Sequence, residues 1–407
     1  MESLVQPVQQ KSRIQSLDIL RGIAILGILI LNIQSFAMPG AAYLNPTAFG
    51  DFDGLNFWVW LFSHAFADQK FITIFSILFG AGIVLVTQKA EAKSGKSAGL
   101  HYKRNFWLLI IGLIHAHLIW YGDILVAYAL GGFIVYFFRK MQPRTLLILG
   151  TLVFSVHSVL YIMTGTSIPY WPQEALQDTM LMWHPPTSEI QQEINALTGS
   201  LSEQINYNSA GALVMETMVY AILFFWKTTG LMLIGMALYK MGILSAERSS
   251  TFYKRGLLVG FIIGFPIVIY GMIQNLAVNF SFEYSMFLGS QYNYWGSLFV
   301  SFGYICAVML LAKSGKFEAL KSKLAAVGQM ALTNYIAQSV IGVLLFFGIG
   351  FGLFGEVDRI MQLTIVFAIW ALQLWWSKPW LDRYKFGPLE WVWRSLSYWK
   401  KQPMKRS

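Results

Sequence analysis

The chain has 407 residues, of which 56% are hydrophobic and only 12% are charged. Soluble domains carry about 25% charged residues, so these numbers exclude a chain made of ordinary soluble domains. They predict an all-α, polytopic helical bundle in a membrane. The single cysteine, Cys306, excludes an intrachain disulfide and a structural metal site built on several thiolates.

The chain contains ten apolar stretches that we interpret as membrane spans, because a helix of about 20 apolar residues crosses a bilayer core. In chain order they are about 17–37, 68–88, 105–121, 122–138, 145–164, 211–239, 256–275, 294–312, 328–350 and 360–377. The transmembrane bundle then covers residues 17–377, between an N-terminal segment (1–16) and a basic C-terminal tail (378–407). Residues from about 165 to 210 carry acidic side chains but no Lys or Arg, which predicts a small acidic outer loop.

The basic residues predict the orientation of the bundle. All but four of the 30 Lys and Arg residues lie in segments that share one side of the membrane when ten spans are drawn. Since Lys and Arg concentrate in cytoplasmic loops, we expect both termini in the cytoplasm. The net charge of +10 therefore reflects the topology, and we expect no nucleic-acid partner.

Two apolar patterns predict local packing. Residues 55–67 are too few to span a membrane but are rich in aromatic side chains, which favours a helix lying at the outer interface. Gly256, Gly260 and Gly264 are spaced four apart, so one face of their helix is open to close approach by a neighbour. We expect this stripe to pack within the bundle; the alternative is the interface of a homodimer.

Polar side chains inside the predicted spans are the candidates for function, because an unpaired ionisable group in a bilayer costs several kcal/mol. At a rise of about 1.5 Å per residue, the candidates in the middle and outer half of the core are Asn32, His115, His117 and Asp123, with His64 and Asp68 above them. We predict that the asparagine, both aspartates and at least one histidine border one continuous cavity open to the outer side. For each histidine, a role as catalytic base competes with that of a neutral side chain bonded to a backbone carbonyl.

His115 and His117 are two residues apart. This spacing places them on opposite faces of a helix. At most one of them can line a shared cavity, and the two cannot chelate one metal ion as an i, i+4 pair could.

Two further pairs of charged residues lie in the predicted spans. Asp18 and Arg21 are three residues apart at the inner edge of the first span, where they meet on one helix face. They form either an ion pair that anchors the helix end or a grip on an anionic cytoplasmic ligand, for which Arg is well suited. Lys227 and Glu216 are either a buried charge pair or site residues, on one long span that we expect to be tilted or broken near Thr228.

Several stretches of the chain resemble the bacterial YeiB-like family of inner-membrane proteins. They are the opening SRIQSLDILRGIAILGILILNIQSF, the stretches QKFITIFSILFGAGI and GLIHAHLIWYGDILVAYALGG, the run NYIAQS, and the ending FGPLEWVWRSLSY. The string from Phe386 to Arg394 is the most specific, because hydropathy does not explain it. The resemblance covers nearly the whole chain and implies a multi-pass protein of the bacterial inner membrane.

The first two spans are also similar to those of heparan-α-glucosaminide N-acetyltransferase and, more remotely, of other membrane acyltransferases. These enzymes move an acyl group from a cytoplasmic thioester to an acceptor across the membrane. In their pattern an LDxxRG opening is followed by an asparagine, an outer-side histidine and an aspartate that heads the second span. The matching residues here are Asp18, Arg21, Gly22, Asn32 and Asp68.

The histidine is where the chain departs from this pattern. The acetyltransferase histidine precedes the aspartate by about ten positions, where this chain has Trp58, whereas His64 lies only four positions before Asp68. Three alternatives follow from this departure. Either His64 takes the role through a different loop path, or His115 or His117 takes it, or the acyl-transfer chemistry is absent.

The resemblance implies an acyltransferase that takes an acyl group, first of all acetyl, from acyl-CoA at the inner face to a glycan or lipid on the outer side. We expect His64 or His115 to be the base. Asp68 would orient this histidine, and Asn32 would orient the thioester carbonyl. The residues expected to hold the donor phosphates, with their acidic neighbour, are Arg21, Lys103, Arg104 and Asp18.

Two other functions compete with this one. The first is a transporter or exporter of a small solute or lipid, in which the same polar residues line a route; the lack of a visible internal repeat opposes it. The second is a non-catalytic lipid-binding or scaffolding protein, for which a line of polar residues through the core would have no purpose. Membrane lipids are expected partners in each case, and no metal is expected.

Overall fold

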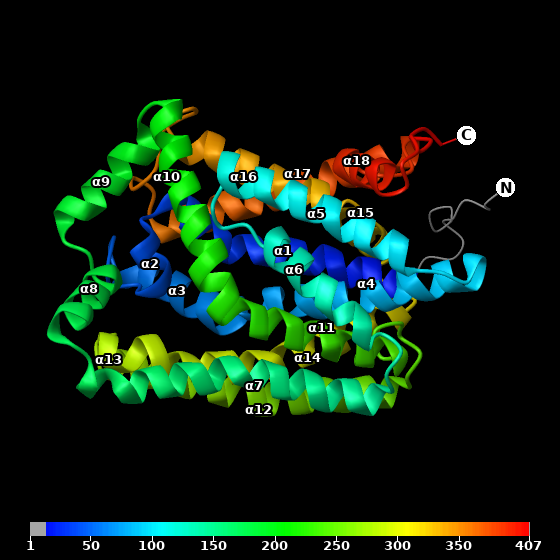
Figure 1. Ribbon diagram of the computed structural model, residues 1–407, viewed down its shortest axis with the longest axis horizontal. Helices are drawn as coiled ribbons and strands as arrows, with labels where there is room; N and C mark the ends of the chain where they lie inside the picture. Colours follow the sequence, from blue (N-terminus) through cyan, green and yellow to red (C-terminus); the bar gives the residue numbers. More distant parts are fainter. Residues whose placement is uncertain (1–13, 407) are drawn as a thin grey trace.

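The computed structural model describes residues 14–406, except for the side chains of residues 221–223. This part of the chain is helical, with an isolated β-bridge between Tyr384 and Lys405. Figure 1 shows the long helices lying side by side. The all-α bundle predicted from composition is therefore confirmed.

The helices of the first half of the chain are α1 (Gln15–Ala37), α2 (Gly40–Leu44), α3 (Gly54–Phe66), α4 (Lys70–Ser94), α5 (Ala98–Leu118), α6 (Leu125–Val135), η2 (Tyr136–Phe138), α7 (Pro143–Ser167), η3 (Ile168–Tyr170), α8 (Gln173–Trp183), α9 (Thr187–Thr198) and α10 (Leu201–Val214). Those of the second half are η4 (Met215–Phe224), α11 (Phe225–Lys240), α12 (Ser250–Ala277), α13 (Phe282–Tyr284), η5 (Ser285–Gly289), α14 (Ser290–Lys313), α15 (Glu318–Gln329), α16 (Ala331–Phe346), α17 (Arg359–Arg383) and α18 (Pro388–Ser397). The segments η2 and η3 are 3₁₀ turns, and η4 and η5 are π-helical.

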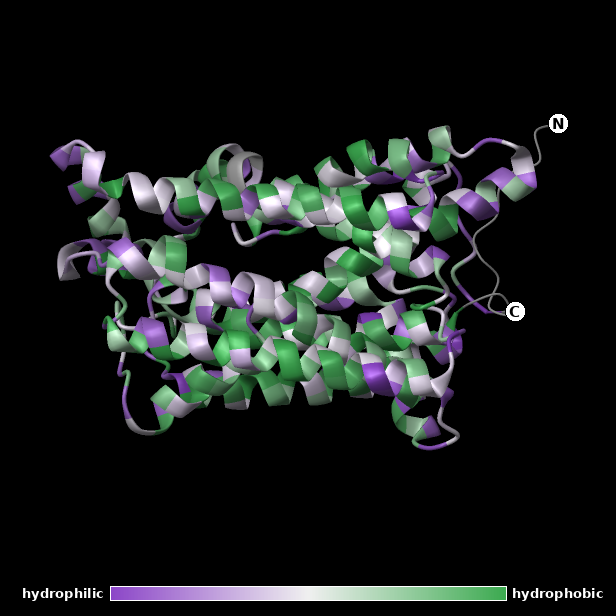
Figure 2. Cartoon of the chain, turned by 90° about the horizontal axis from the view of Figure 1, so that it is seen from below, coloured by the Kyte–Doolittle hydropathy of each residue, from purple (hydrophilic) through white to green (hydrophobic). Residues whose placement is uncertain are grey.

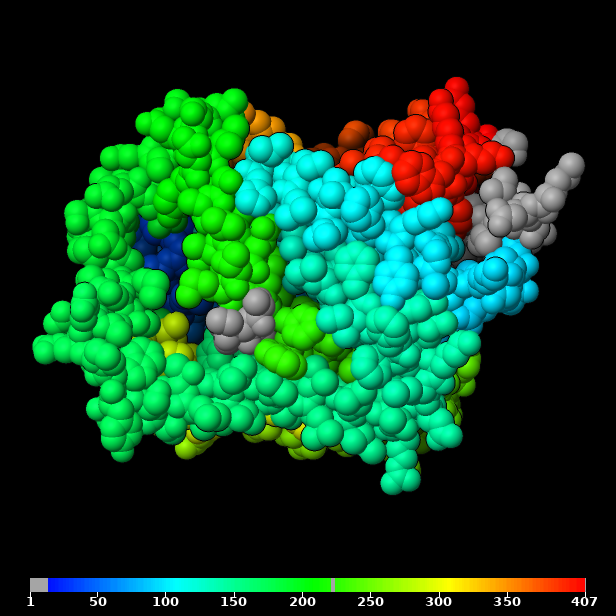
Figure 3. All heavy atoms as spheres, in the orientation of Figure 1, coloured from blue at the N-terminus to red at the C-terminus, as the bar shows by residue number. Residues whose placement is uncertain are grey.

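The bundle has two distinct ends. In Figure 1, α7, α12 and α14 run along one edge, α5, α16 and α17 along the other, and α1, α4 and α11 between them. Figure 3 shows the surfaces of α8 and α9 (green) and of α18 (red) at opposite ends of the molecule. Hydrophilic residues gather toward both ends in Figure 2, with apolar residues between them. Following the predicted topology, we call the end with α18 the inner end and the end with α8 and α9 the outer end.

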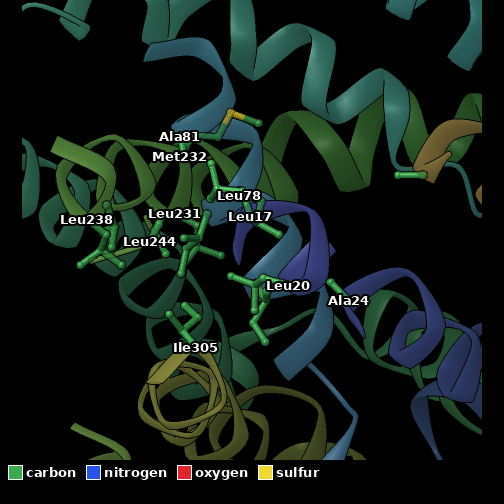
Figure 4. Packing of buried hydrophobic residues seen from close by; sticks show 14 of the residues in the cluster. Leu17, Leu20, Ala24, Leu78, Ala81, Leu231, Met232, Leu238, Leu244 and Ile305 are labelled. Carbon is green, nitrogen blue, oxygen red and sulfur yellow. The ribbon is translucent and has the colours of Figure 1, made fainter. Parts of the chain in front are cut away.

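The main hydrophobic core is built around α1. Figure 4 shows Leu17, Leu20 and Ala24 of α1 close to Leu78 of α4 and Leu231 of α11. The most apolar stretch of α1 is 72% buried within the protein, compared with 22% for α7 and 28% for α12. Consequently α1 is a central helix, whereas α7 and α12 turn much of their apolar surface outward, as lipid-facing helices do.

Among the described residues, fewer helices than the ten predicted spans are long and apolar enough to cross a membrane. In the described part of the chain six helical segments are long and apolar enough to cross a membrane, and two bent helix pairs raise this to eight at most. The two predicted spans that fall outside this set are 105–121, which corresponds to α5, and 122–138, which corresponds to the shorter apolar helix Leu125–Phe138. A count of ten stays a prediction.

Two predicted spans lie at bends between helices. The predicted span 328–350 corresponds to α16, which is shorter: it begins at Ala331, after a bend of 79° that separates it from α15, and it ends at Phe346. The span 211–239 is bent by 64° between Tyr220 and Phe225, before the expected position near Thr228. The π-helical segment η4 lies at this second bend, and such a segment interrupts the regular i to i−4 hydrogen bonding of an α-helix.

The predicted acidic outer loop is mostly helical. Residues 165–210 contain α8, α9 and the first part of α10. The start of α10 is fixed by a capping box, in which the Ser200 side chain accepts from the Glu203 N–H and the Glu203 carboxylate accepts from the Ser200 N–H. Polar composition alone had suggested a loop, whereas capping and helical propensity favour short helices here.

The glycine stripe packs within the bundle. A Cβ atom added at Gly260 would lie 2.7 Å from the carbonyl oxygen of Phe299 on α14, and one at Gly264 would lie 2.6 Å from Val300 Cγ2. These glycines therefore let the backbones of α12 and α14 approach closely. The predicted packing role is confirmed, and a homodimer stays a prediction that this stripe does not support.

Candidate functional site

A pocket near the outer end is formed by the last turns of α1, the end of α3 and the first turn of α17. It is a small, partly open pocket with a cavity volume of about 40 Å³. Its apolar wall comes largely from α1, and its polar lining consists of Gln34, Tyr43, Ser63, His64, Asp68, Arg359 and Gln362. Two of the predicted site residues, the histidine and the aspartate of the α3–α4 junction, thus share one cavity.

The turn between α3 and α4 brings these two residues together. Gln69 adopts a left-handed conformation, with φ of 66°, which interrupts the helix between α3 and α4. His64 Nδ1 lies 3.0 Å from Asp68 Oδ2, and the His64 ring stacks on Trp60 with 5.3 Å between ring centroids. A carboxylate at Nδ1 fixes the orientation of an imidazole and leaves its Nε2 free to exchange a proton.

Asp68 is hydrogen-bonded to Asn293 of α14, which is bonded in turn to Lys70 of α4. The Asn293 amide donates to Asp68 Oδ2 over 2.7 Å, and Lys70 Nζ donates to Asn293 Oδ1 over 2.6 Å. Lys70 also donates to the backbone carbonyl of His64 over 2.8 Å. The sequence-based site did not include Asn293, although the signal was present as a polar run, QYNYW, just where a predicted span begins.

Lys227 belongs to the same neighbourhood. Its ammonium group donates to the side-chain oxygen of Gln69, the residue that follows Asp68. The alternative of a buried charge pair between Lys227 and Glu216 is wrong, because Glu216 instead lies 3.4 Å from His117 Nε2. The bend at η4 separates the two residues, so they do not share a helix face.

His115 and Asp123 form a second pair, which is sealed inside the bundle. His115 Nδ1 lies 2.7 Å from Asp123 Oδ1, and each residue is only 1% exposed. The other carboxylate oxygen of Asp123 accepts from the backbone N–H of Val126, at the start of α6, over 2.7 Å. The rings of Trp120 and Tyr335 pack against the imidazole, and His115 Nε2 has no hydrogen-bond partner among the described residues.

His117 faces away from this pair, as its spacing predicted. Its Nδ1 lies 2.7 Å from the hydroxyl of Ser209 on α10. Asn32 is half-buried on α1 and is not among the residues that line the outer pocket. The predicted single cavity is therefore wrong: His64 and Asp68 line the pocket, while His115 with Asp123, His117 and Asn32 lie elsewhere.

The inner end carries the residues expected to hold a donor. Arg21 Nη1 lies 3.1 Å from Asp18 Oδ1, which confirms the contact expected from their spacing. The Arg104 guanidinium lies 4.1 Å above the ring of Trp393 on α18, and Lys103 is exposed. A role for these side chains in binding phosphates stays a prediction.

Comparison with known proteins supports the resemblance to the YeiB-like family. The family model described as "Protein of unknown function (DUF418)" matches residues 238–400. The chain is 31% identical to a Bacillus subtilis (strain 168) protein named "Uncharacterized protein YxaH", over 99% of this chain and 98% of that protein. It is also 31% identical to an Escherichia coli (strain K12) protein named "Uncharacterized protein YeiB", over 94% of this chain and 95% of that one. The chain belongs to the YeiB-like family.

The specific tail motif of this YeiB-like protein has a structural role. Glu390 of α18 accepts from the backbone N–H groups of Leu332 and Thr333, over 2.6 and 3.1 Å, at the start of α16. It also accepts from the Thr333 hydroxyl over 2.6 Å, and burial raises the pKa of Glu390. The C-terminal region is thus not a free tail, because α18 caps the bend between α15 and α16.

Proposed function

We propose that this YeiB-like protein is an acyltransferase of the bacterial inner membrane, with both termini in the cytoplasm. It would move an acyl group, first of all acetyl, from acyl-CoA at the inner end to a hydroxyl or amine of a glycan or lipid at the outer end. The observation that supports this proposal best is the His64–Asp68 pair on the wall of the outer pocket. An oriented imidazole beside a cavity is the arrangement that general base catalysis needs.

His64 is a better candidate for the base than His115. The side chain of His64 is 19% exposed and lines the pocket, so an acceptor can reach it. His115 is enclosed by aromatic rings and is 1% exposed. Both histidines have a carboxylate at Nδ1, so access to substrate is what distinguishes them.

The transfer step needs one base and one polar group for the carbonyl. His64 takes the proton from the acceptor O–H or N–H, and the acceptor atom attacks the thioester carbonyl carbon. The C–S bond then breaks, and the proton passes from His64 to the departing CoA thiolate. Asp68 keeps the imidazole in position and stabilises its protonated form. Asn32, the residue expected to orient the thioester carbonyl, does not line this pocket, so we assign it no part in the step.

The donor would enter from the inner end along α1. Arg21 precedes Ile33 of the pocket wall by twelve residues, which corresponds to about 18 Å along a helix. A donor held by Arg21, Lys103 and Arg104 must therefore extend far into the bundle. Acyl-CoA has the required form, because its thioester lies at the end of a long flexible arm and its phosphates lie at the other end.

Transfer of labelled acetyl from CoA in inside-out vesicles tests the proposal. Vesicles with the wild-type protein should label an endogenous lipid or glycan. Arg21→Gln should raise the KM for the donor roughly tenfold or more, because a charge-assisted hydrogen bond contributes about 1.5–3 kcal/mol. Asp18→Asn is the matched control, since it breaks the same ion pair but keeps the cation, and its KM should stay near that of wild type. Absence of any labelled product would refute the proposal.

A transporter of a small solute or lipid is the second candidate. The two bent helix pairs favour it, because broken helices at membrane depth commonly line the routes of transporters. The buried ammonium groups of Lys70 and Lys227 near Asp68 are a second point in its favour. Solute flux that persists in His64→Gln, without any acyl product, would support this candidate over the enzyme.

A further inference from the structure

We infer that the outer pocket binds an anionic lipid and that Arg359 recognises its phosphate. This inference names the acceptor class of the proposed acyl transfer and in that respect rests on it, although lipid binding can be measured without any donor. Three features point to this ligand: a buried guanidinium on the pocket wall, a local excess of basic side chains, and an apolar lining that continues to exposed aromatic residues.

Arg359 is a buried cation that lines the pocket. It is the first residue of α17 and is only 3% exposed. Its Nη1 donates to the carbonyl of Asp51 and its Nη2 to the carbonyl of Pro46, both over 2.8 Å. Its Nε has no partner among the described residues. Within the described part of the chain, Arg359 forms no ion pair with a carboxylate at 4.0 Å or less.

Burying a guanidinium without an ion-pair partner costs free energy, so we expect a negatively charged ligand to bind beside Arg359. Carbonyl partners satisfy hydrogen bonds but do not neutralise a full charge. Asp51 is 308 positions away in the sequence but close in space, and its exposed carboxylate acts on the guanidinium electrostatically without forming an ion pair with it. A phosphate in the pocket would supply both the missing charge and an acceptor for Nε.

The remaining charges around the pocket also favour an anion. Asp68 is the acidic residue of the lining, and it is already engaged by His64 and Asn293. Lys70 and Lys227 lie near Asp68, both are buried, and their hydrogen bonds go to neutral oxygens. Basic side chains therefore outnumber the single carboxylate.

The N-terminus of α17 adds to this positive field. The helix is 25 residues long, and Gln362 of its first turn lines the pocket. Helix N-termini carry a partial positive charge that favours anions. Asp358 caps this end by accepting from the N–H of Met361, but it is exposed and does not line the pocket.

The apolar part of the pocket favours a lipid over a soluble phosphate. Ile30, Leu31 and Ile33 of α1 form much of the lining. On α3, whose residues Trp60 and His64 face the pocket, Trp58 and Phe62 are 52% and 55% exposed. Acyl chains could lie against these exposed apolar side chains while the headgroup enters the pocket. A hydroxyl or amine on that headgroup would then lie near His64.

The test is thermal unfolding of the full-length protein, purified in a maltoside detergent, with added lipids and no acyl-CoA. Phosphatidylglycerol should raise the melting temperature, since a ligand that binds only the folded state stabilises it by mass action. Diacylglycerol, which lacks the phosphate, and phosphatidylcholine, which has no net charge, should shift it much less. Equal shifts with all three lipids would overturn the inference.

Two variants link the effect to the guanidinium. Arg359→Gln should weaken phosphatidylglycerol binding roughly tenfold or more, the factor that corresponds to one charge-assisted hydrogen bond. Arg359→Lys keeps the charge without the planar fork and should lose less. The Arg359→Lys variant also keeps the inference testable if Arg359→Gln does not fold. If Arg359→Lys binds phosphatidylglycerol with unchanged affinity, and this binding does not weaken as the salt concentration rises, the inference is contradicted. Lys316→Gln, at an exposed inner-end position, is the control and should bind like wild type.

Inorganic phosphate separates the two sources of the same chemistry. If phosphate alone stabilises the wild type through Arg359 and phosphatidylglycerol does not, the pocket takes a soluble anion and the lipid assignment is wrong. The proposed acyl transfer is tested separately, so its failure and the failure of this inference can be distinguished. Arg359-dependent lipid binding without acetyl transfer keeps the inference and removes the enzyme, whereas acetyl transfer without such binding does the reverse.

Discussion

The molecule contains two His–Asp pairs with the same chemistry in opposite environments. His64 and Asp68 meet at 3.0 Å on the wall of the outer pocket, and His115 and Asp123 meet at 2.7 Å inside the bundle. In each pair Nδ1 faces the carboxylate. The first pair is partly open to the pocket, whereas the side chains of the second are 1% and 0% exposed.

The local backbone explains why the two pairs differ. His64 and Asp68 are four residues apart where α3 ends and α4 has not yet begun, and both side chains line a space bounded by α1 and α17. Asp123 lies in the segment between α5 and α6, and it binds His115 with one oxygen and the N–H of Val126 with the other. The open pair is therefore accessible from the pocket, as the proposed function requires, whereas the sealed pair joins the end of α5 to the start of α6.

The largest expected effect is on acyl transfer. His64→Gln keeps a hydrogen-bonding side chain but removes the basicity, so the rate should fall by roughly 10²- to 10⁴-fold, the usual contribution of a general base. His115→Gln should leave the rate per folded molecule near that of wild type. The measurement is acetyl transfer in inside-out vesicles, normalised to folded protein by size-exclusion chromatography.

The same pair of variants can reverse the assignment. Loss of transfer in His115→Gln with full activity in His64→Gln would make the sealed pair the catalytic one. It would also mean that the bundle opens around α5 during turnover, since nothing reaches His115 in this conformation. Loss of transfer in both variants, with both folded, would contradict the clean division between the two pairs.

The second effect is on stability, where we expect the sealed pair to matter more than the open pair. Asp123→Ala leaves a buried histidine and the Val126 N–H without their partner, and removing one member of a buried pair costs about 3–5 kcal/mol. Asp68→Ala should cost less, because its histidine partner is partly exposed and can be solvated from the pocket. Melting temperatures in detergent measure both. Asp123→Asn, which keeps the volume and an acceptor for Val126, should fall between Asp123→Ala and wild type.

Much of the architecture could be predicted from local sequence. Long apolar stretches predict helices because backbone groups in lipid must be satisfied within the helix. The spacing of Asp18 and Arg21 predicts their contact, since residues three apart share a helix face. The glycine stripe on α12 predicts close packing for the same reason of periodicity. All three are properties of a single helix.

The partners of the polar residues could not be predicted in this way. The bond between His115 and Asp123 depends on how the chain folds back after α5, and the contact of Asn293 with Asp68 joins residues 225 positions apart. The bend at Met330 likewise depends on Glu390, which caps the start of α16 from a distant helix. Hydropathy predicts that a polar group is buried, but its hydrogen-bond partner depends on the tertiary fold.

The smallest expected effect decides whether the sealed pair is only structural. The indole N–H of Trp120, beside His115, is buried and has no partner among the described residues, and neither has His115 Nε2. Trp120→Phe removes this donor and keeps most of the ring packing. If nothing binds there, the substitution should change the free energy of unfolding by less than about 1 kcal/mol, because the loss of packing is offset by removing an unsatisfied group.

A larger cost would mean that a water molecule or a ligand hydroxyl bridges the two nitrogens, accepting from Trp120 and donating to His115. His115→Gln then provides the cross-check, because coupled costs in a double-mutant cycle with Trp120→Phe require a shared partner or direct contact. Additive effects would leave His115 and Asp123 as a brace between α5 and α6. In that case only the open pair at the pocket has the access that chemistry requires.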